Sequence, residues 1–170
     1  MSAPLTTQPG FTRALAAVRG GEIGLLRAVA LDLVAVGGGD ALQGLRIEAI
    51  GVLRAVTGPS SVELQAHSTS DGGATTFLGR AGHGVVVNAH VSVVAGERRE
   101  CLRATIRLVG THGSVLVDLL RPRLDVRTAA GMRHPSFGAR RAEVSPGDAA
   151  EALTAIAASA RSGQTISITW

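Results

Sequence analysis

Alternating apolar and polar residues fill the middle of the chain and predict a series of β-strands. The clearest apolar sets lie between residues 61 and 127: Val62, Leu64 and Ala66; Val85, Val87, Ala89, Val91 and Val93; Leu102, Ala104, Ile106 and Leu108. Residues 74–80, 114–120 and 121–127 add further strand candidates. Period-two alternation sends successive side chains to opposite faces. We therefore predict an antiparallel meander with one apolar and one polar face.

The segments before the meander predict a helix, a strand and a second helix. Residues 11–20 predict a short helix, and residues 23–36 predict a long strand that ends at three consecutive glycines. Asp40 is the expected cap of the next helix, which stops at Gly58–Pro59. The apolar residues of this helix recur at steps of three and four: Leu42, Leu45, Ala49, Ile50, Leu53 and Val56.

The last part of the chain predicts a loop, a helix and a strand. Residues 129–142 show no periodicity and predict an irregular loop. Ser145 followed by Pro146 is typical of a helix start, and Gly163 ends that helix. Residues 165–169 alternate and predict a final strand.

These elements predict an α+β fold with an open, mostly antiparallel sheet and two or three helices packed on one face. A chain of 170 residues fits one domain, which we place at residues 11–170 after a flexible N-terminus at residues 1–10. Aromatic residues make up 2% of the chain, so the core must consist of Ala, Val, Leu and Ile. The other sheet face needs cover, and we expect a homodimer through that open face.

Composition narrows the chemistry. All 17 basic residues are arginine and there is no tyrosine, which excludes Schiff-base lysines and tyrosine proton donors. The net charge is +4, but the arginines are scattered and few aromatic residues are available for base stacking, so we expect no nucleic-acid partner. No apolar run is long enough for a membrane helix and the N-terminus lacks a signal-peptide pattern, so we expect a cytoplasmic protein.

Four strings, in this order, resemble the C-terminal domain of the glucose–fructose oxidoreductase / inositol dehydrogenase (Gfo/Idh/MocA) family. They are VRGGEIGLLRAV, GVLRAVTGPSSVELQA, IRLVGTHGSVLVD and ALTAIAASARSGQTISI. The resemblance covers about residues 13–169 and implies the fold of that domain. It also suggests that His112, in the Gly110–Gly113 turn, has a structural role.

The resemblance implies a Rossmann domain that binds NAD(P), and we expect this chain to lack that domain and to bind no cofactor. The family carries an aspartate and a proton-carrying histidine on the helix that ends here at Gly58. Those two positions hold Gly44 and Glu48 in this chain. Glu48 could still transfer a proton, but the dehydrogenase mechanism is not expected.

Polar residues of the predicted meander form the candidate site. The candidate catalytic residues are Glu48, His67 and His90, and the candidate substrate-binding residues are Glu63, Asn88, Arg103 and Arg107. Histidine and glutamate can act as acid or base, and arginine can hold an anionic or polyoxygenated molecule. If the strand registers place them on one side, they line one surface; the alternative is a solvated face or a dimer interface. No histidine pair has metal-ligand spacing, so we expect no metal.

Three functions remain open. The first is a cofactor-independent isomerase, cyclase or dehydratase that acts on a small, secondary-metabolic substrate. The second is a non-catalytic partner subunit of a Rossmann-containing oxidoreductase. The third is a small-molecule binding protein without turnover.

Overall fold

The structure is a computed structural model that describes residues 4–96, 101–121, 123–135 and 150–169. Its helices are α1 (Pro9–Arg19), α2 (Gly39–Thr57) and α3 (Ala150–Ser162), with short 3-10 turns η1 (Leu5–Thr7) and η2 (Gly82–Gly84). Its strands are β1 (Leu26–Val36), β2 (Ser61–Ser68), β3 (Ala74–Ala81), β4 (Val85–Val94), β5 (Cys101–Gly110), β6 (Gly113–Asp118), β7 (Arg123–Thr128), β8 (Gly131–Arg133) and β9 (Ile166–Thr169).

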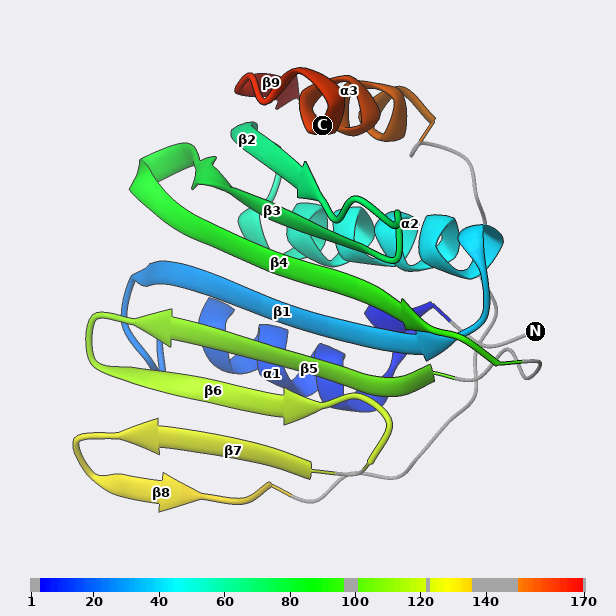
Figure 1. The fold of residues 1–170 in the computed structure, drawn as a ribbon. Coiled ribbons are helices and arrows are strands. Elements are labelled where there is room, and N and C mark those ends of the chain that lie inside the picture. The colour runs from blue at the N-terminus through cyan, green and yellow to red at the C-terminus, as the bar shows by residue number, and fades with distance from the viewer. Residues whose placement is uncertain (1–3, 97–100, 122, 136–149, 170) are drawn as a thin grey trace.

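These strands form one sheet in the order β8-β7-β6-β5-β1-β4-β3-β2-β9 (Figure 1). β1 pairs with β4 in parallel, and the other neighbouring strands pair in antiparallel fashion. The predicted continuous meander is therefore wrong at one point, because β1 lies between β4 and β5. Alternation identifies strands and their faces, but it carries no information on which strand lies next to which.

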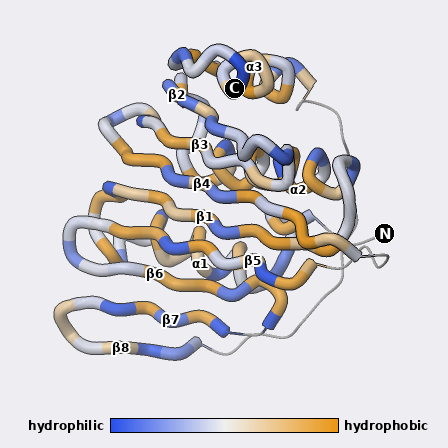
Figure 2. Tube along the Cα trace, viewed as in Figure 1, coloured by the Kyte–Doolittle hydropathy of each residue, from blue (hydrophilic) through white to orange (hydrophobic). Residues whose placement is uncertain are grey.

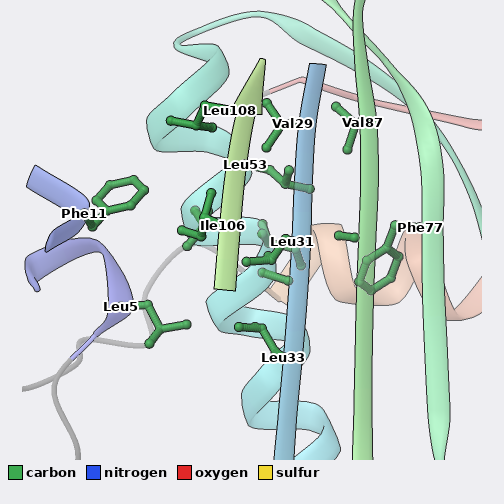
Figure 3. Packing of buried hydrophobic residues seen from close by; sticks show 14 of the residues in the cluster. Leu5, Phe11, Val29, Leu31, Leu33, Leu53, Phe77, Val87, Ile106 and Leu108 are labelled. Atoms are coloured by element: carbon green, nitrogen blue, oxygen red, sulfur yellow. The ribbon is translucent and has the colours of Figure 1, made fainter. Parts of the chain in front are cut away.

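All the described helices pack on the same face of the sheet: Figure 1 shows α1 and α2 behind the strands and α3 beside β2 at the top. α1 covers β6 and β7, α2 covers β1 and β4, and α3 covers β2 and β9. Figure 3 shows Val29 and Leu31 of β1 beside Leu53 of α2 and Ile106 of β5, all at most 3% exposed. The predicted α+β class, with an open and mostly antiparallel sheet covered on one face, is confirmed.

The first strand begins later than its sequence pattern predicted. β1 starts at Leu26, Leu25 is 69% exposed, and the pairing with β5 is irregular between Leu26 and Ala28. Gly24 has a positive φ of +74°, which ends the strand geometry there. Ile23 is buried, yet it lies outside the strand, so its match to the alternation did not indicate strand structure.

Other element ends also differ from the prediction. The cap of α2 is Gly38, and Asp40 lies in the first helical turn, where its negative charge faces the positive end of the helix dipole. The predicted boundary at residue 11 does not mark the start of the packed structure, because Leu5 is buried in η1 and α1 begins at Pro9. The predicted loop at 129–142 contains β8, which pairs with β7. The helix start predicted at Ser145 and Pro146 lies outside the described residues.

No helix in the described part of the chain combines the length and apolar character needed to cross a membrane.

Candidate functional site

The strand registers bring the predicted polar residues of the sheet onto one side. One row crosses six strands, from β2 to β6, through residues that lie directly opposite one another in register: His67, Thr76, His90, Asp32, Thr105 and Asp118. A second row runs parallel to it through Gln65, Leu78, Asn88, Ala30, Arg107, Leu116 and Asp125. We call the face that carries both rows the open face, because the described helices pack on the other side.

The remaining predicted sheet residues belong to this face as well. Glu63 lies opposite Arg80, which lies opposite Val86. Arg103 lies opposite Val34, which lies opposite Ser92. Thus six of the predicted site residues share the open face: Glu63, His67, Asn88, His90, Arg103 and Arg107.

His90 is the best-positioned titratable group of the open face. Its Nδ1 lies 3.1 Å from Oγ1 of Thr76, so the threonine fixes the orientation of the ring. Asp32 occupies the adjacent register position on β1 and accepts a hydrogen bond from Nη1 of Arg103 at 2.9 Å. This bond to the Asp32 carboxylate raises the pKa of Arg103. An oriented imidazole therefore lies beside an ion pair, a combination that can move a proton and hold a polar ligand.

Sequence reasoning missed Asp32 and Thr76. Asp32 is the one carboxylate of β1, in a strand that is otherwise apolar except for Arg27. A charged residue in the middle of such a strand was the signal that could have identified it. Thr76 carried no comparable signal, because threonine is common in strands.

Glu48 lies on the other side of the sheet from these residues. It belongs to α2, where its Oε2 accepts a hydrogen bond from the backbone N–H of Leu5 at 2.9 Å. Burial raises the pKa of Glu48, and the bond from Leu5 opposes that effect. The structure therefore does not bring Glu48 together with His67 and His90, and it gives the carboxylate a role in fastening η1 to α2.

A second charged group occupies the open face on β7, next to the edge strand β8. The carboxylate of Asp125 accepts hydrogen bonds from Nη2 of Arg123 at 3.0 Å and, through its other oxygen, from the His134 ring at 2.8 Å. Asp125 is only 4% exposed, because these two side chains cover it. The hydrogen bonds from Arg123 and His134 lower the pKa of Asp125. Sequence reasoning had placed His134 in a loop and assigned no partner to it.

Two of the strings that carry the family resemblance meet in space, on the covered side. The backbone N–H of His112 donates to the carbonyl of Ile23 at 2.9 Å, and that of Thr111 donates to the carbonyl of Leu25 at 3.0 Å. A Cβ on Gly110 would lie 2.1 Å from the Ile23 carbonyl oxygen, and one on Gly24 would lie 2.2 Å from Thr111 Oγ1. We call this contact the glycine junction. It explains Gly110 by the close approach of the Ile23 backbone, and Gly24 by its positive φ and the Thr111 and His112 side chains beside it. It also gives His112 a structural position.

Comparison with solved structures finds the same fold in oxidoreductases. A protein described as an oxidoreductase from Thermotoga maritima superposes with a TM-score of 0.75 and 18% identity, over 97% of this chain and 62% of its own. An aldose-aldose oxidoreductase from Caulobacter crescentus gives 0.73 and 16%, over 97% and 62%. An oxidoreductase from Agrobacterium radiobacter gives 0.72 and 17%, over 95% and 62%.

The chain has the fold of a Gfo/Idh/MocA-type oxidoreductase domain. The resemblance in the sequence strings is thereby confirmed for the fold. The chain spans 62% of the length of the structures just described, and identities of 16% to 18% show the fold alone. No protein family profile and no curated protein matches the sequence.

Proposed function

We propose that this chain is a cofactor-independent enzyme that catalyses proton transfer on a small polyoxygenated molecule in the cytoplasm, as an isomerase, cyclase or dehydratase does. One observation carries the proposal: His90, oriented by Thr76, lies in register beside Asp32, which is paired with Arg103. Such reactions need an acid, a base and a charged group to hold the substrate, and the open face supplies all three.

The proposed reaction uses Nε2 of His90, since Nδ1 is engaged with Thr76. In an isomerisation, Nε2 takes a proton from the carbon next to a carbonyl group, and the electron pair of that C–H bond forms an enediolate. The protonated imidazole then returns the proton to the neighbouring carbon, which was the carbonyl carbon, while the hydroxyl proton of the first carbon passes to the former carbonyl oxygen. Atoms and electrons therefore balance, and no oxidant or reductant is consumed. Arg107, exposed one row away, is the group proposed to stabilise the enediolate oxygen.

The ligands of structures with the same fold suggest the substrate class. The Agrobacterium radiobacter oxidoreductase was solved with NAD+, L-tartaric acid and magnesium, and the Caulobacter crescentus enzyme with glycerol. A levoglucosan dehydrogenase was solved with NADH and levoglucosan, and with NADH and L-sorbose. These small molecules carry several oxygen atoms, so we propose a sugar, a polyol derivative or a hydroxy acid as the substrate of this chain.

Deuterium exchange tests the proposed chemistry. A panel of aldoses, ketoses and hydroxy acids is incubated with the protein in D2O, and proton NMR follows the loss of the signal next to the carbonyl. We expect catalysed exchange in at least one compound and its loss in His90→Asn. His83→Asn is the matched control, because His83 is exposed and its left-handed backbone (φ 60°) suits asparagine. Binding without exchange, seen as a ligand-dependent rise in Tm, would instead favour a binding protein without turnover.

We also propose that a second copy of the chain covers part of the open face. Leu78, in the row of Asn88 and Arg107, and Val86, opposite Arg80 in the neighbouring row, are 44% and 47% exposed on this face. Large apolar side chains on an exposed sheet face are typical of an interface. Light scattering after gel filtration should show a dimer, and Leu78→Arg should convert it into a monomer. A wild-type monomer at micromolar concentration would contradict the dimer and leave the His90 proposal to the exchange experiment.

A partner subunit is the second candidate function. It is favoured by how much of its neighbours' length this chain spans: 62% of the Agrobacterium radiobacter oxidoreductase, solved with NAD+, and 44% of the levoglucosan dehydrogenase, solved with NADH. Calorimetric titration of the isolated chain with NADH and NADPH separates the two proposals. We expect no binding heat, whereas micromolar affinity would contradict cofactor independence. If exchange activity is absent but appears when a nucleotide-binding oxidoreductase subunit is added, the partner function replaces the enzyme proposal.

A further inference from the structure

A polar cluster on the helix-covered side of the sheet lies apart from the open face and has no part in the proposed function. It consists of Arg46 of α2, Thr75 of β3 and Ser68 of β2. Arg46 donates to Oγ1 of Thr75 from Nε at 3.2 Å and from Nη2 at 2.7 Å. Ser68 lies opposite Thr75 in register, and the two hydroxyl oxygens are 3.1 Å apart. Thr75 is 1% exposed, whereas Ser68 is exposed at the end of its strand.

The direction of the hydroxyl hydrogens follows from these contacts. Thr75 Oγ1 already accepts two hydrogen bonds from Arg46, so its own hydrogen is the one that bridges to Oγ of Ser68. The hydrogen of Ser68 is then free to point outward. On the guanidinium, Thr75 takes the Nε hydrogen and one Nη2 hydrogen, which leaves the Nη1 group and the other Nη2 hydrogen as donors. The cluster therefore presents donors from two neighbouring side chains, the remaining N–H groups of Arg46 and the hydroxyl of Ser68.

The charge of Arg46 is not balanced within the described part of the chain. None of the described carboxylates forms an ion pair with it. Asp71, in the loop that joins β2 and β3, instead accepts hydrogen bonds from Thr69 and from the backbone of Gly73. Partial burial lowers the pKa of Arg46, the opposite of the effect that Asp32 has on Arg103. A partly desolvated cation without a carboxylate is costly unless an anion joins it.

We propose that Arg46 and Ser68 form a binding subsite for an oxyanion, either a carboxylate or a phosphate group. The planar guanidinium matches two oxygens of such a group, and the outward hydroxyl of Ser68 matches a further one. Holding α2 against β3 would require only the two N–H groups that Arg46 donates to Thr75, and an uncharged side-chain amide could make the same kind of hydrogen bond. The remaining charged donors are what a bound oxyanion uses.

An NMR titration of the wild-type protein tests this subsite. Sodium phosphate and sodium acetate are added in separate arms at constant ionic strength, balanced with sodium chloride. We expect saturable shifts of the Arg46 Nε–H and of the Ser68 and Thr75 amides, with a Kd on the order of 1 mM. The tighter of the two arms identifies the oxyanion class. Shifts that do not saturate, or that spread equally over exposed arginines such as Arg13, would overturn the proposal.

Three variants sharpen the result. Arg46→Gln should abolish the saturable shifts, whereas Arg13→Gln, which removes the same charge from the exposed side of α1, should leave them unchanged. Ser68→Ala should weaken binding about tenfold and should lower Tm only modestly, since it removes the acceptor of the Thr75 hydroxyl but leaves the Arg46–Thr75 contact in place. Retained binding in Arg46→Gln, or unchanged affinity in Ser68→Ala, would contradict the subsite. If Arg46→Gln fails to fold, the wild-type titration and Ser68→Ala still decide.

Discussion

The two faces of the sheet belong to the same strands, yet their side chains differ in burial and polarity. On β1, Leu31 and Leu33 lie beneath α2 and are at most 3% exposed. The alternate residues Asp32 and Val34 face the open side and are partly exposed. Figure 2 shows hydrophilic and hydrophobic residues mixed along the strands, with α1 and α2 behind the sheet. The covered face is mainly a buried aliphatic layer, with the polar cluster of Arg46, Thr75 and Ser68 beside it. The open face carries an ion pair, an oriented histidine and exposed leucine and valine side chains.

This difference separates the residues that specify the fold from the residues that are available for chemistry. The glycine junction and the aliphatic layer lie on the covered side, and they specify an architecture that oxidoreductases of very different sequence share. Substitutions on the open face cost little packing energy, so that face is free to change its chemistry. The comparison therefore predicts large stability losses on one side and mainly functional losses on the other.

The largest effect is expected at the glycine junction. Gly110→Ala would place a methyl group 2.1 Å from the carbonyl oxygen of Ile23, which is backbone and cannot turn aside. We expect a loss of at least about 4 kcal/mol in the free energy of unfolding, measured by urea denaturation. Gly44→Ala is the control, because nothing lies within 4 Å of its Cβ position and alanine favours the interior of α2. It should gain up to about 1 kcal/mol. Equal effects of the two variants would show that close approach does not explain the glycine pattern.

Adjacent residues of β1 give the next largest effect and the most direct test of the comparison. Leu33→Ala removes a fully buried side chain from the covered face and should cost about 3 kcal/mol. Val34→Ala removes a half-buried side chain from the open face and should cost less than about 1 kcal/mol in the monomer. Thermal denaturation at low protein concentration measures both. A loss at Val34 as large as that at Leu33 would indicate that the open face is packed as tightly as the covered one.

Much of the fold could be predicted from the sequence because strand alternation and helix periodicity each record a buried face. Val87, Ala89 and Val91 occupy alternate positions of β4, and all are 0% exposed. The position of β1 between β4 and β5 could not be predicted, because pairing depends on contacts between distant segments. The start of β1 was misplaced because Ile23 is buried by the glycine junction and not by strand packing.

The candidate site was predicted in part for the same reason. His67, His90 and Arg103 share a face because each alternates with buried neighbours in its own strand, and the registers align the strands. Glu48 was chosen through the resemblance of its helix, which says nothing about the direction of its side chain relative to the sheet. The Asp125–His134 pair could not be predicted, because His134 is positioned by β8, a strand of three residues that is too short to show alternation.

A smaller, pH-dependent effect is expected at Asp125. Its folded-state pKa is lowered by the hydrogen bonds from Arg123 and His134, so the charged form favours the folded state. The stabilisation is present above the unfolded-state pKa of about 3.9 and is lost as pH falls through the lower folded-state value. Asp125→Asn should therefore lower stability at pH 7 and should flatten the decrease of stability below pH 4. Urea titrations at pH 7, 4 and 3 measure both slopes. If the decrease of stability below pH 4 is the same in Asp125→Asn as in the wild type, other carboxylates cause that decrease.

The smallest effect is expected at Glu48, and it tests whether the role of that carboxylate is structural. Burial raises its folded-state pKa above the unfolded value of about 4.3, so the protonated form favours the folded state. That contribution is present below the unfolded-state pKa and is lost as pH rises through the folded-state pKa. Glu48→Gln keeps an oxygen that can accept the Leu5 N–H and removes the charge, so at pH 7 it should match or exceed wild-type stability by less than about 1 kcal/mol. Glu48→Ala, which loses the acceptor, should be less stable.

The Glu48→Gln variant also tests the position of Glu48 relative to the candidate site. Because the sheet separates Glu48 from His90, deuterium exchange catalysed by Glu48→Gln should equal that of the wild type. A loss of exchange would mean that Glu48 takes part in the reaction.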